Sequence, residues 1–323
     1  MRQKIILSTQ PLDEYAENKL SEHGIFKVAK EASTQGVMNE IQDAVALVVR
    51  GQVPITAAVM DAAPNLRVIG RTGVGYETVD VNAASARGIA VVNTPGAGAR
   101  AVAEAAMTFM LALCKKMTFW DTQTKAGNWN SRLTEQGTDL DGMTLGIVGL
   151  GRIGQIVARM ATPFEMNVIA YDPYIDSSIA SSLNITLVDL DTLLSQAHFV
   201  TLHCPQNDET MGLISAERLS KMRQGSFFIN LARGGIVDSL DPIYKMLMSG
   251  HLAGAALDVF LVEPPDHTHP IFSLDNCLVS PHAMATTTGA MTRIYKSMSD
   301  DISAILNGQQ PNHVVNPEIL ENK

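Results

Sequence analysis

Short apolar runs alternate with amphipathic, helix-like segments along most of this chain. Strands that are apolar on both faces and alternate with helices are typical of a parallel sheet covered on both sides. In the first hundred residues the apolar runs are KIILS (4–8), AVALVVR (44–50), LRVIG (66–70) and GIAVVN (88–93), and the helix-like segments include 11–24 and 54–63. These residues therefore predict one α/β unit.

A second unit is predicted after the Pro- and Gly-containing segment TPGAGAR (94–100), which places a domain seam near residue 99. A long helical pattern (101 to about 117) and a polar stretch (124–139) come first. The strand-like runs then follow as TLGIV (144–148), MNVIAYD (166–172), FVTLHC (199–204), SFFIN (226–230), AGAALDV (253–259) and CLVS (277–280), with a further βα stretch between the second and third of them. The final helix-like segment, about 283–306, precedes only the short apolar run HVV (313–315), so we expect it to pack back onto the first unit.

The composition fits a globular enzyme of two domains: 323 residues, 46% hydrophobic and 18% charged. A net charge of −9 argues against a nucleic-acid partner and requires any anionic substrate to find a local cationic pocket. Three widely spaced cysteines suggest reduced thiols and a cytoplasmic location. The N-terminus is not signal-like, and the most apolar helical run (101–114) is too short for a bilayer, so we expect no membrane partner.

The segment GLGRIG (149–154) follows the predicted strand TLGIV and opens a helix-like segment. Gly149, Gly151 and Gly154 would let the turn close and the backbone approach a pyrophosphate at the helix N-terminus. Asp172 ends the next strand, where a carboxylate can accept hydrogen bonds from an adenosine ribose and repel a 2′-phosphate. The sequence therefore predicts NAD rather than NADP as the cofactor, in preference to a Gly-rich turn with an incidental Asp.

The segment INLARGGIVD (229–238) ends an apolar strand with Arg233 beside two glycines. A permanently charged guanidinium there is either paired with an internal acid or bound to an anion. Strand ends in doubly wound sheets are where ligands bind, and a dinucleotide motif so far along the chain leaves a whole α/β unit upstream. We therefore expect a ligand cleft between the two units.

Seven segments in order resemble the D-isomer-specific 2-hydroxy acid dehydrogenase family, over nearly the whole chain. They are GRTGVGYETVD (70–80), VVNTPGAGARAVAE (91–104), LGIVGLGRIG (145–154), TLHCPQNDETMGLI (201–214), FINLARGGIVD (228–238), ALDVFLVEP (256–264) and SPHAMATT (280–287). The resemblance implies a flavodoxin-like catalytic domain built from residues 1–99 and 286–323, and an inserted Rossmann-type NAD domain over 100–285. It also implies a homodimer through the NAD domain, using residues 100–140 with Trp129 as an anchor.

By the same resemblance, Arg233 binds the substrate carboxylate and carbonyl, His282 is the acid/base, and Glu263 holds that histidine. A histidine that titrates near neutral pH suits proton exchange with a 2-hydroxy acid in both directions. Asp258 would contact the nicotinamide carboxamide, and the backbone of Val74 and Gly75 would receive the substrate carboxylate. The remaining predicted cofactor contacts are Arg152, Ile153, Cys204, Leu231 and Ala232, together with Arg233 and His282 themselves. Formate dehydrogenases carry Gln in place of Glu263, which makes formate an unfavoured substrate.

Two further arginines, Arg50 and Arg71, end or follow strands of the first unit and are candidates to bind the distal anion of a substrate such as 3-phosphoglycerate. The alternative is that both are solvated or paired, or that Arg71 supports its loop. The closest motif match is to phosphoglycerate dehydrogenases. A glyoxylate or hydroxypyruvate reductase, and an NAD-sensing protein like the C-terminal-binding corepressors, remain alternatives.

The pair His267 and His269 has no further ligand cluster nearby in sequence, so we predict no metal there. The sequence leaves open the exact substrate, the direction of the reaction in the cell, and the roles of Arg50 and of the loop with these histidines.

Overall fold

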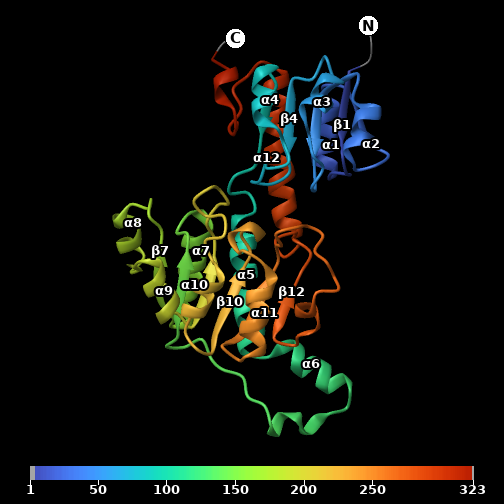
Figure 1. Ribbon diagram of the computed structural model, residues 1–323. Helices are drawn as coiled ribbons and strands as arrows, with labels where there is room; N and C mark the ends of the chain where they lie inside the picture. Colours follow the sequence, from blue (N-terminus) through green and yellow to red (C-terminus); the bar gives the residue numbers. More distant parts are fainter. Residues whose placement is uncertain (1–3, 322–323) are drawn as a thin grey trace. The chain divides into compact units, whose positions relative to one another are not determined.

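A computed structural model describes residues 4–321, which divide into two compact units (Figure 1). Unit 1 contains the described residues up to Gly98 and from Thr287 onward, and unit 2 runs from Ala99 to Thr286. Each unit is built on a parallel sheet of its own. The predicted fold class, two parallel-sheet α/β domains, is therefore confirmed.

The sheet of unit 1 has the strand order β2-β1-β3-β4-β5, which is the flavodoxin-like doubly wound order. Its strands in the described part are β1 (Ile5–Ser8), β2 (Ile25–Val28), β3 (Ala44–Val49), β4 (Val68–Arg71) and β5 (Ala90–Val92). Every residue of the central β3 is buried, as its continuous apolar run predicts. The edge strand β2 was not predicted, because most of it is exposed and its sequence has no continuous apolar run.

Helices cover both faces of this sheet. The shorter helices α2 (Thr34–Glu40), α3 (Ala57–Asp61) and α4 (Val81–Ala86) share one core with it, and α1 (Glu14–Ser21) and α12 (Thr288–Leu306) share the other. The prediction that the last helix packs on the first unit is confirmed, since Met298 and Ile302 belong to that second core. The helix begins at Thr288 because Thr287 caps it, its Oγ1 accepting from the Ala290 N–H at 3.2 Å.

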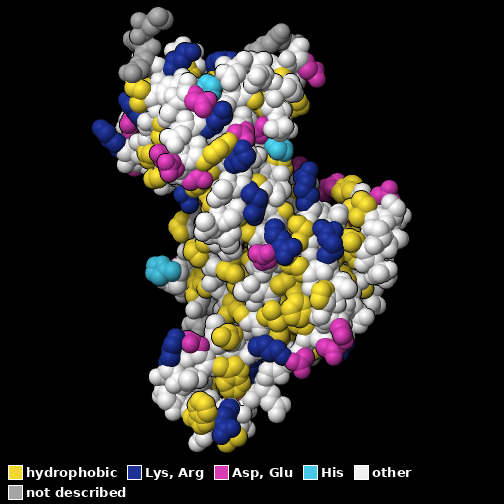
Figure 2. All heavy atoms as spheres, turned by 180° about the vertical axis from the view of Figure 1, so that it is seen from behind, with side chains coloured by type: hydrophobic (Ala, Val, Ile, Leu, Met, Phe, Trp, Pro, Cys, Tyr) yellow, Lys and Arg dark blue, Asp and Glu magenta, His cyan; other side chains and the backbone are white. Residues whose placement is uncertain are grey.

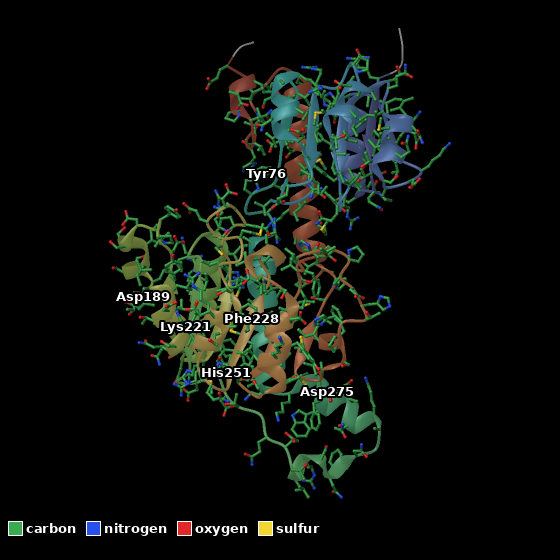
Figure 3. All side chains as sticks on the ribbon, in the orientation of Figure 1. Tyr76, Asp189, Lys221, Phe228, His251 and Asp275 are labelled. Atoms are coloured by element: carbon green, nitrogen blue, oxygen red, sulfur yellow. The ribbon has the colours of Figure 1, made fainter. Side chains whose placement is uncertain are left out.

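The sheet of unit 2 has the order β12-β11-β10-β9-β6-β7-β8, the Rossmann arrangement with one further strand. The strands are β6 (Thr144–Val148), β7 (Asn167–Tyr171), β8 (Thr186–Leu187), β9 (Phe199–Leu202), β10 (Ser226–Asn230), β11 (Leu252–Leu257) and β12 (Cys277–Val279). Phe228, labelled in Figure 3, belongs to the interior strand β10 and is fully buried.

The two faces of the second sheet carry different helices. One core contains residues of α5 (Ala99–Cys114) and α7 (Arg152–Ala161). The other contains residues of α9 (Leu190–Gln196), α10 (Ala216–Lys221) and α11 (Leu240–Met248), while α8 (Ser177–Ser182) contacts β8. The remaining short 3₁₀ turns are η2 (Thr162–Phe164), η3 (Gly234–Ile236), η4 (Pro270–Ser273) and, in unit 1, η5 (Pro317–Ile319).

The helix predicted over 101 to about 117 ends earlier than expected. Lys116 has φ = +50°, a left-handed conformation that stops α5 at Cys114 and starts a separate helix, α6 (Met117–Lys125). Together with η1 (Trp129–Leu133), α6 forms an arm that projects from the rest of unit 2 (Figure 1). Neither element has a buried residue, and hydrophobic side chains are visible on the surface of this projection (Figure 2).

The short apolar run HVV (313–315) has no strand conformation. It is held beside β5 instead, where the Val315 N–H donates to the Val91 carbonyl at 2.7 Å. The next residue, Asn316, is buried: its Oδ1 accepts from the Val91 N–H at 2.8 Å, and its Nδ2 donates to the Ile89 carbonyl at 2.9 Å. Among residues 4–321, no helix is both long enough and apolar enough to cross a membrane.

We expect Asn316→Ala to lower the free energy of unfolding by about 2–4 kcal/mol, because it leaves a buried N–H and a buried carbonyl without their partner. Denaturant or thermal unfolding measures the change. Asn307→Ala is the control: Asn307 is exposed, and its substitution should change stability by less than about 0.5 kcal/mol. Equal effects of the two substitutions would show that Asn316 does not anchor this segment.

Candidate active site

The predicted site residues of unit 2 follow strands of one parallel sheet. Because parallel strands in register end at the same edge, the segments after β6, β7, β9, β10, β11 and β12 are brought to one side of the sheet. This is the edge at which doubly wound sheets bind ligands. Residues between 149 and 284 thereby gather in one region of the fold.

The glycine-rich turn leads directly from β6 into α7. Gly149 has φ = +94°, and a Cβ added there would lie 2.6 Å from the backbone nitrogen of Cys204. Gly151 is the N-cap residue, and α7 begins with Arg152 and Ile153 and includes Gly154. The first N–H groups of a helix have no partner within it, so this turn presents donors suited to a pyrophosphate.

Asp172 directly follows β7, and its carboxylate holds this turn. Its Oδ2 accepts from the Leu150 N–H at 2.8 Å and its Oδ1 from the Tyr174 N–H at 3.0 Å. A carboxylate oxygen can accept more than one hydrogen bond, so both remain able to accept from a ribose hydroxyl. The hydroxyl of Tyr174 also bonds to Glu209, which comes from the segment after β9. The donor and acceptor set at this edge fits NAD.

Two residues after β9 have titrations shifted by burial. Burial lowers the pKa of His203 to about 3, and one ring nitrogen, Nε2, lies 3.0 Å from Thr201 Oγ1. Burial raises the pKa of the Cys204 thiol to about 11, so the thiol is protonated at neutral pH and a poor nucleophile. Both residues are therefore suited to lining a site rather than to reacting in it.

Arg233 follows β10 in a turn shaped by the buried Asn230. The Asn230 side chain donates to the Arg233 carbonyl at 3.0 Å and accepts from the Ala232 N–H at 3.0 Å. The Arg233 guanidinium donates to the Ala232 carbonyl at 2.8 Å. The next residue, Gly234, touches the segment after β11: a Cβ there would lie 1.9 Å from the Phe260 carbonyl carbon. Only glycine allows this approach.

Leu231, the residue just after β10, is buried in the core that contains α5 and α7. Its side chain therefore packs inside unit 2.

The pair predicted to act on protons is in contact. His282 Nδ1 lies 3.0 Å from Glu263 Oε2, and the Phe260 N–H donates to the other carboxylate oxygen, Oε1, at 3.1 Å. A carboxylate can only accept, so neutral His282 carries its proton on Nδ1 and donates it to Glu263. The lone pair of Nε2 is then left for a substrate. His282 has φ = +54°, an unusual conformation for a residue with a side chain.

Asp258, which follows β11, is buried and bonds to the segment that carries His282. Its Oδ1 accepts from Ser280 Oγ at 2.6 Å, from the Ala283 N–H at 2.9 Å and from the Met284 N–H at 3.3 Å. The His282 N–H donates to the Asp258 backbone carbonyl at 2.8 Å. The carboxylate thus organises the turn around His282, a function that the sequence did not reveal.

In unit 1, the loop after β4 carries the other predicted substrate contacts. The Asn93 side chain donates to the Val74 carbonyl at 2.7 Å, and Arg71 Nε donates to the Gly75 carbonyl at 3.0 Å. Among the described residues, the N–H groups of Val74 and Gly75 have no hydrogen-bond partner. The loop, marked by Tyr76 in Figure 3, therefore holds its carbonyls and leaves two N–H donors.

The surroundings of Arg71 do not favour the prediction that it binds the distal anion of a substrate. It is buried, and its Nη1 donates to the carbonyls of Val49 at 3.1 Å and Gly51 at 2.8 Å, in addition to the bond to Gly75. Such bonds favour the alternative in which Arg71 supports the loop.

Arg50 makes fewer hydrogen bonds within the protein than Arg71 does. Its guanidinium lies 5.8 Å from the centre of the Tyr295 ring and makes a long bond of 3.4 Å to the Pro11 carbonyl. Most of its N–H donors are therefore available to a ligand.

In the loop that contains His267 and His269, the contacts of His269 give it a structural role. His269 Nδ1 accepts from the Ile271 N–H at 3.2 Å at the start of η4, and its Nε2 lies 3.3 Å from Asp241. Within residues 4–321, no group of three or more His, Cys, Asp and Glu side chains has the arrangement of a metal site.

Sequence reasoning missed the residues that hold the predicted ones in place: Asn93, Asn230, Phe260 and Ser280. Each acts through a backbone group or through one bond to another side chain. Ser280 stands two residues before His282, but nothing in its type or spacing signalled a bond to Asp258.

Comparison with known proteins gives consistent results. Residues 107–284 match the model of the D-isomer specific 2-hydroxyacid dehydrogenase, NAD binding domain. The chain is 38% identical over 317 residues to D-3-phosphoglycerate dehydrogenase of Archaeoglobus fulgidus, covering 98% of this chain and 60% of the relative. It is 39% identical to hydroxypyruvate reductase of Thermotoga maritima, covering 88% of this chain and 92% of the relative.

One solved structure is similar over nearly the full length of the chain. The chain is similar to D-lactate dehydrogenase from Aquifex aeolicus complexed with NAD and lactic acid, with a TM-score of 0.86 and 26% identity. The match covers 96% of this chain and 98% of that one. The family model matches more than half of this chain, and the match to the hydroxypyruvate reductase covers nearly all of that relative. This chain therefore belongs to the D-isomer specific 2-hydroxyacid dehydrogenase family.

Proposed function

We propose that this chain is an NAD-dependent oxidoreductase that transfers a hydride between nicotinamide and C2 of a D-2-hydroxy or 2-keto acid. The observation that carries the proposal is the His282 Nδ1 to Glu263 Oε2 contact of 3.0 Å. It joins a proton carrier to a carboxylate at the ligand-binding edge of the NAD binding domain. The family relationship supports the same reaction.

NAD, when bound, would supply the nicotinamide ring that accepts or donates the hydride. His282 takes the hydroxyl proton during oxidation of the hydroxy acid and returns it to the carbonyl oxygen during reduction. Glu263 holds the ring and stabilises the imidazolium that forms, while Arg233 binds the carboxylate and polarises the carbonyl. The N–H groups of Val74 and Gly75 are further donors for the substrate carboxylate.

For the cofactor, we assign the pyrophosphate to the Gly149–Gly154 turn with Arg152 and Ile153, and the ribose to Asp172. We assign the wall of the site to Cys204, Ala232 and the backbone of Leu231, whose side chain is in the core, and the carboxamide contact to Asp258.

For the substrate, we propose a doubly anionic acid of the 3-phosphoglycerate class. The phosphoglycerate dehydrogenases of Archaeoglobus fulgidus and Methanocaldococcus jannaschii support this, at 38% and 40% identity, although the chain spans only 60% of the length of each. Arg50 is our candidate for the distal anion, since its guanidinium makes only weak contacts. A hydroxypyruvate or glyoxylate reductase is the second candidate, favoured by relatives of nearly the same length.

We further propose a homodimer formed through residues 100–140. The arm exposes Met117, Trp129 and Leu133 at 62%, 66% and 72%, and Arg132 lies over the Trp129 ring at 5.6 Å. Apolar exposure of this extent indicates a covered surface. Sedimentation of the purified protein at the mass of a monomer would contradict it. We propose a cytoplasmic location because all three cysteines are free, and cell fractionation tests this.

Wild-type protein should oxidise NADH with at least one member of a panel of 2-keto acids. Arg233→Gln and His282→Ala should each lower turnover by about 10²–10⁴-fold, because they remove substrate charge recognition and proton transfer. Glu263→Gln should have a smaller effect. Fluorescence titration should show that all three variants still bind NADH.

Undiminished activity of His282→Ala would refute the mechanism. NADH binding without turnover of any acid in the panel would instead support the non-enzymatic, NAD-sensing alternative.

Asp172→Ser should reduce the preference for NADH over NADPH by about tenfold or more, because it replaces the carboxylate that accepts from the ribose with a shorter, neutral hydroxyl and removes the charge that repels a 2′-phosphate. The ratio of kcat/KM values for the two cofactors measures this. Asp172→Asn is the matched variant: it keeps an acceptor for the Leu150 N–H but loses the charge, which separates support of the turn from repulsion. Equal use of both cofactors by the wild type would show that the ribose assignment is wrong.

Arg50→Ala should raise KM for 3-phosphohydroxypyruvate by about tenfold or more and leave KM for glyoxylate nearly unchanged, because only the former carries a distal anion. Arg71→Ala should impair both substrates to a similar extent, since it loosens the loop that binds their shared carboxylate. Steady-state kinetics with the two substrates distinguishes these outcomes. If Arg50→Ala affects both acids equally, the reductase alternative gains support.

A further inference from the structure

We propose that Ser280 is a positioning residue, which fixes His282 through the Asp258 carboxylate and so ties the acid/base to the residue that receives the nicotinamide. The proposal rests on the proposed function for the roles of His282 and Asp258. It adds a residue and a connection that the family assignment does not contain.

The first observation is the conformation of His282. A φ of +54° is disfavoured for a residue with a Cβ, so other contacts must maintain it. The His282 N–H is held by two carbonyls, those of Asp258 at 2.8 Å and Ser280 at 3.0 Å. The direction of the imidazole is therefore set by how this short turn packs around Asp258.

The second observation is that the two oxygens of the Asp258 carboxylate differ in their hydrogen bonds. Oδ1 accepts three hydrogen bonds from the turn, and Ser280 Oγ makes the shortest of them, at 2.6 Å. No bond to Oδ2 is formed within the described residues, so this oxygen is available to accept from the carboxamide N–H. One rigid group thus has one oxygen for the histidine turn and one for the cofactor.

Among the three donors to Oδ1, Ser280 is the one supplied by a side chain, and its bond to a buried carboxylate is charge-assisted. The other two donors are backbone N–H groups that follow His282 in the chain. Ser280 precedes His282 and secures the opposite end of the turn. Without its hydroxyl, the turn is bonded to Oδ1 only on the far side of His282, and the ring can move relative to Glu263.

The test is Ser280→Ala, with Ser280→Thr as the conservative variant that keeps the hydroxyl. Ser273→Ala is the matched control, because that exposed serine donates to the Pro270 carbonyl at 2.7 Å in η4. We expect Ser280→Ala to lower kcat about tenfold. Its KM for the keto acid and its Kd for NADH should stay within about twofold of wild type, and Ser280→Thr should recover most of the loss.

A readout that needs no turnover is the imidazole signal of His282 in a protein with ¹³C-labelled histidine, assigned by its absence in His282→Gln. We expect this signal to shift or broaden in Ser280→Ala and to match wild type in Ser280→Thr and Ser273→Ala. If Ser280→Ala does not fold, Ser280→Cys, a weaker donor, replaces it, with a smaller change in the same direction.

An unchanged His282 signal in the folded Ser280→Ala protein would overturn the proposal. So would a kcat equal to wild type, or a loss that Ser280→Thr does not recover. Absence of turnover in the wild type would refute the proposed function, while the imidazole signal would still decide whether Ser280 positions His282.

Discussion

The parallel registration of six strands in unit 2 is the constraint on which its candidate site depends. Strands β6, β7, β9, β10, β11 and β12 are joined side by side, so their carboxyl ends open onto one edge. Each strand end delivers one part of the site: the glycine turn, Asp172, Cys204, Arg233, Asp258 and His282. Residues more than a hundred positions apart are thereby gathered without any local sequence relationship between them.

Close backbone packing then fixes the positions of the turns at this edge relative to one another. Gly149 lies against the backbone of Cys204, and Gly234 lies against that of Phe260, each at a distance that excludes a Cβ. The second contact connects the turn of Arg233 with the segment that holds Glu263, since the Phe260 N–H donates to that carboxylate. The carboxylates of Asp172, Asp258 and Glu263 all accept backbone N–H groups, so the acids that would contact ligands also hold the loops around them.

The arginines illustrate how burial decides the function of a charged side chain. Arg50 and Arg71 both stand at the carboxyl ends of strands in unit 1, and from sequence both were candidates for binding a substrate anion. Arg71 is buried and donates to three backbone carbonyls, whereas Arg50 stays partly exposed with one long bond. A guanidinium has five N–H donors, and the number already used within the protein governs whether it can bind a ligand. That number depends on the fold.

The sequence by itself determined the fold class, the family and most of the strands, because these follow from continuous apolar runs and from motifs of adjacent residues. It also identified Asp172, Arg233, Glu263 and His282 as candidates from their places in those motifs. It missed β2 and the break at Lys116, where an exposed edge and one left-handed residue leave no apolar signature. The tertiary structure alone decided the contacts that orient the candidates: Ser280 with Asp258, Gly234 with Phe260, and Arg71 with the loop carbonyls. Most of these contacts join segments that are twenty or more residues apart in the chain. The contact of Arg71 with the nearby Gly75 is to a backbone carbonyl, which every residue has. No spacing of residue types in the sequence therefore encodes them.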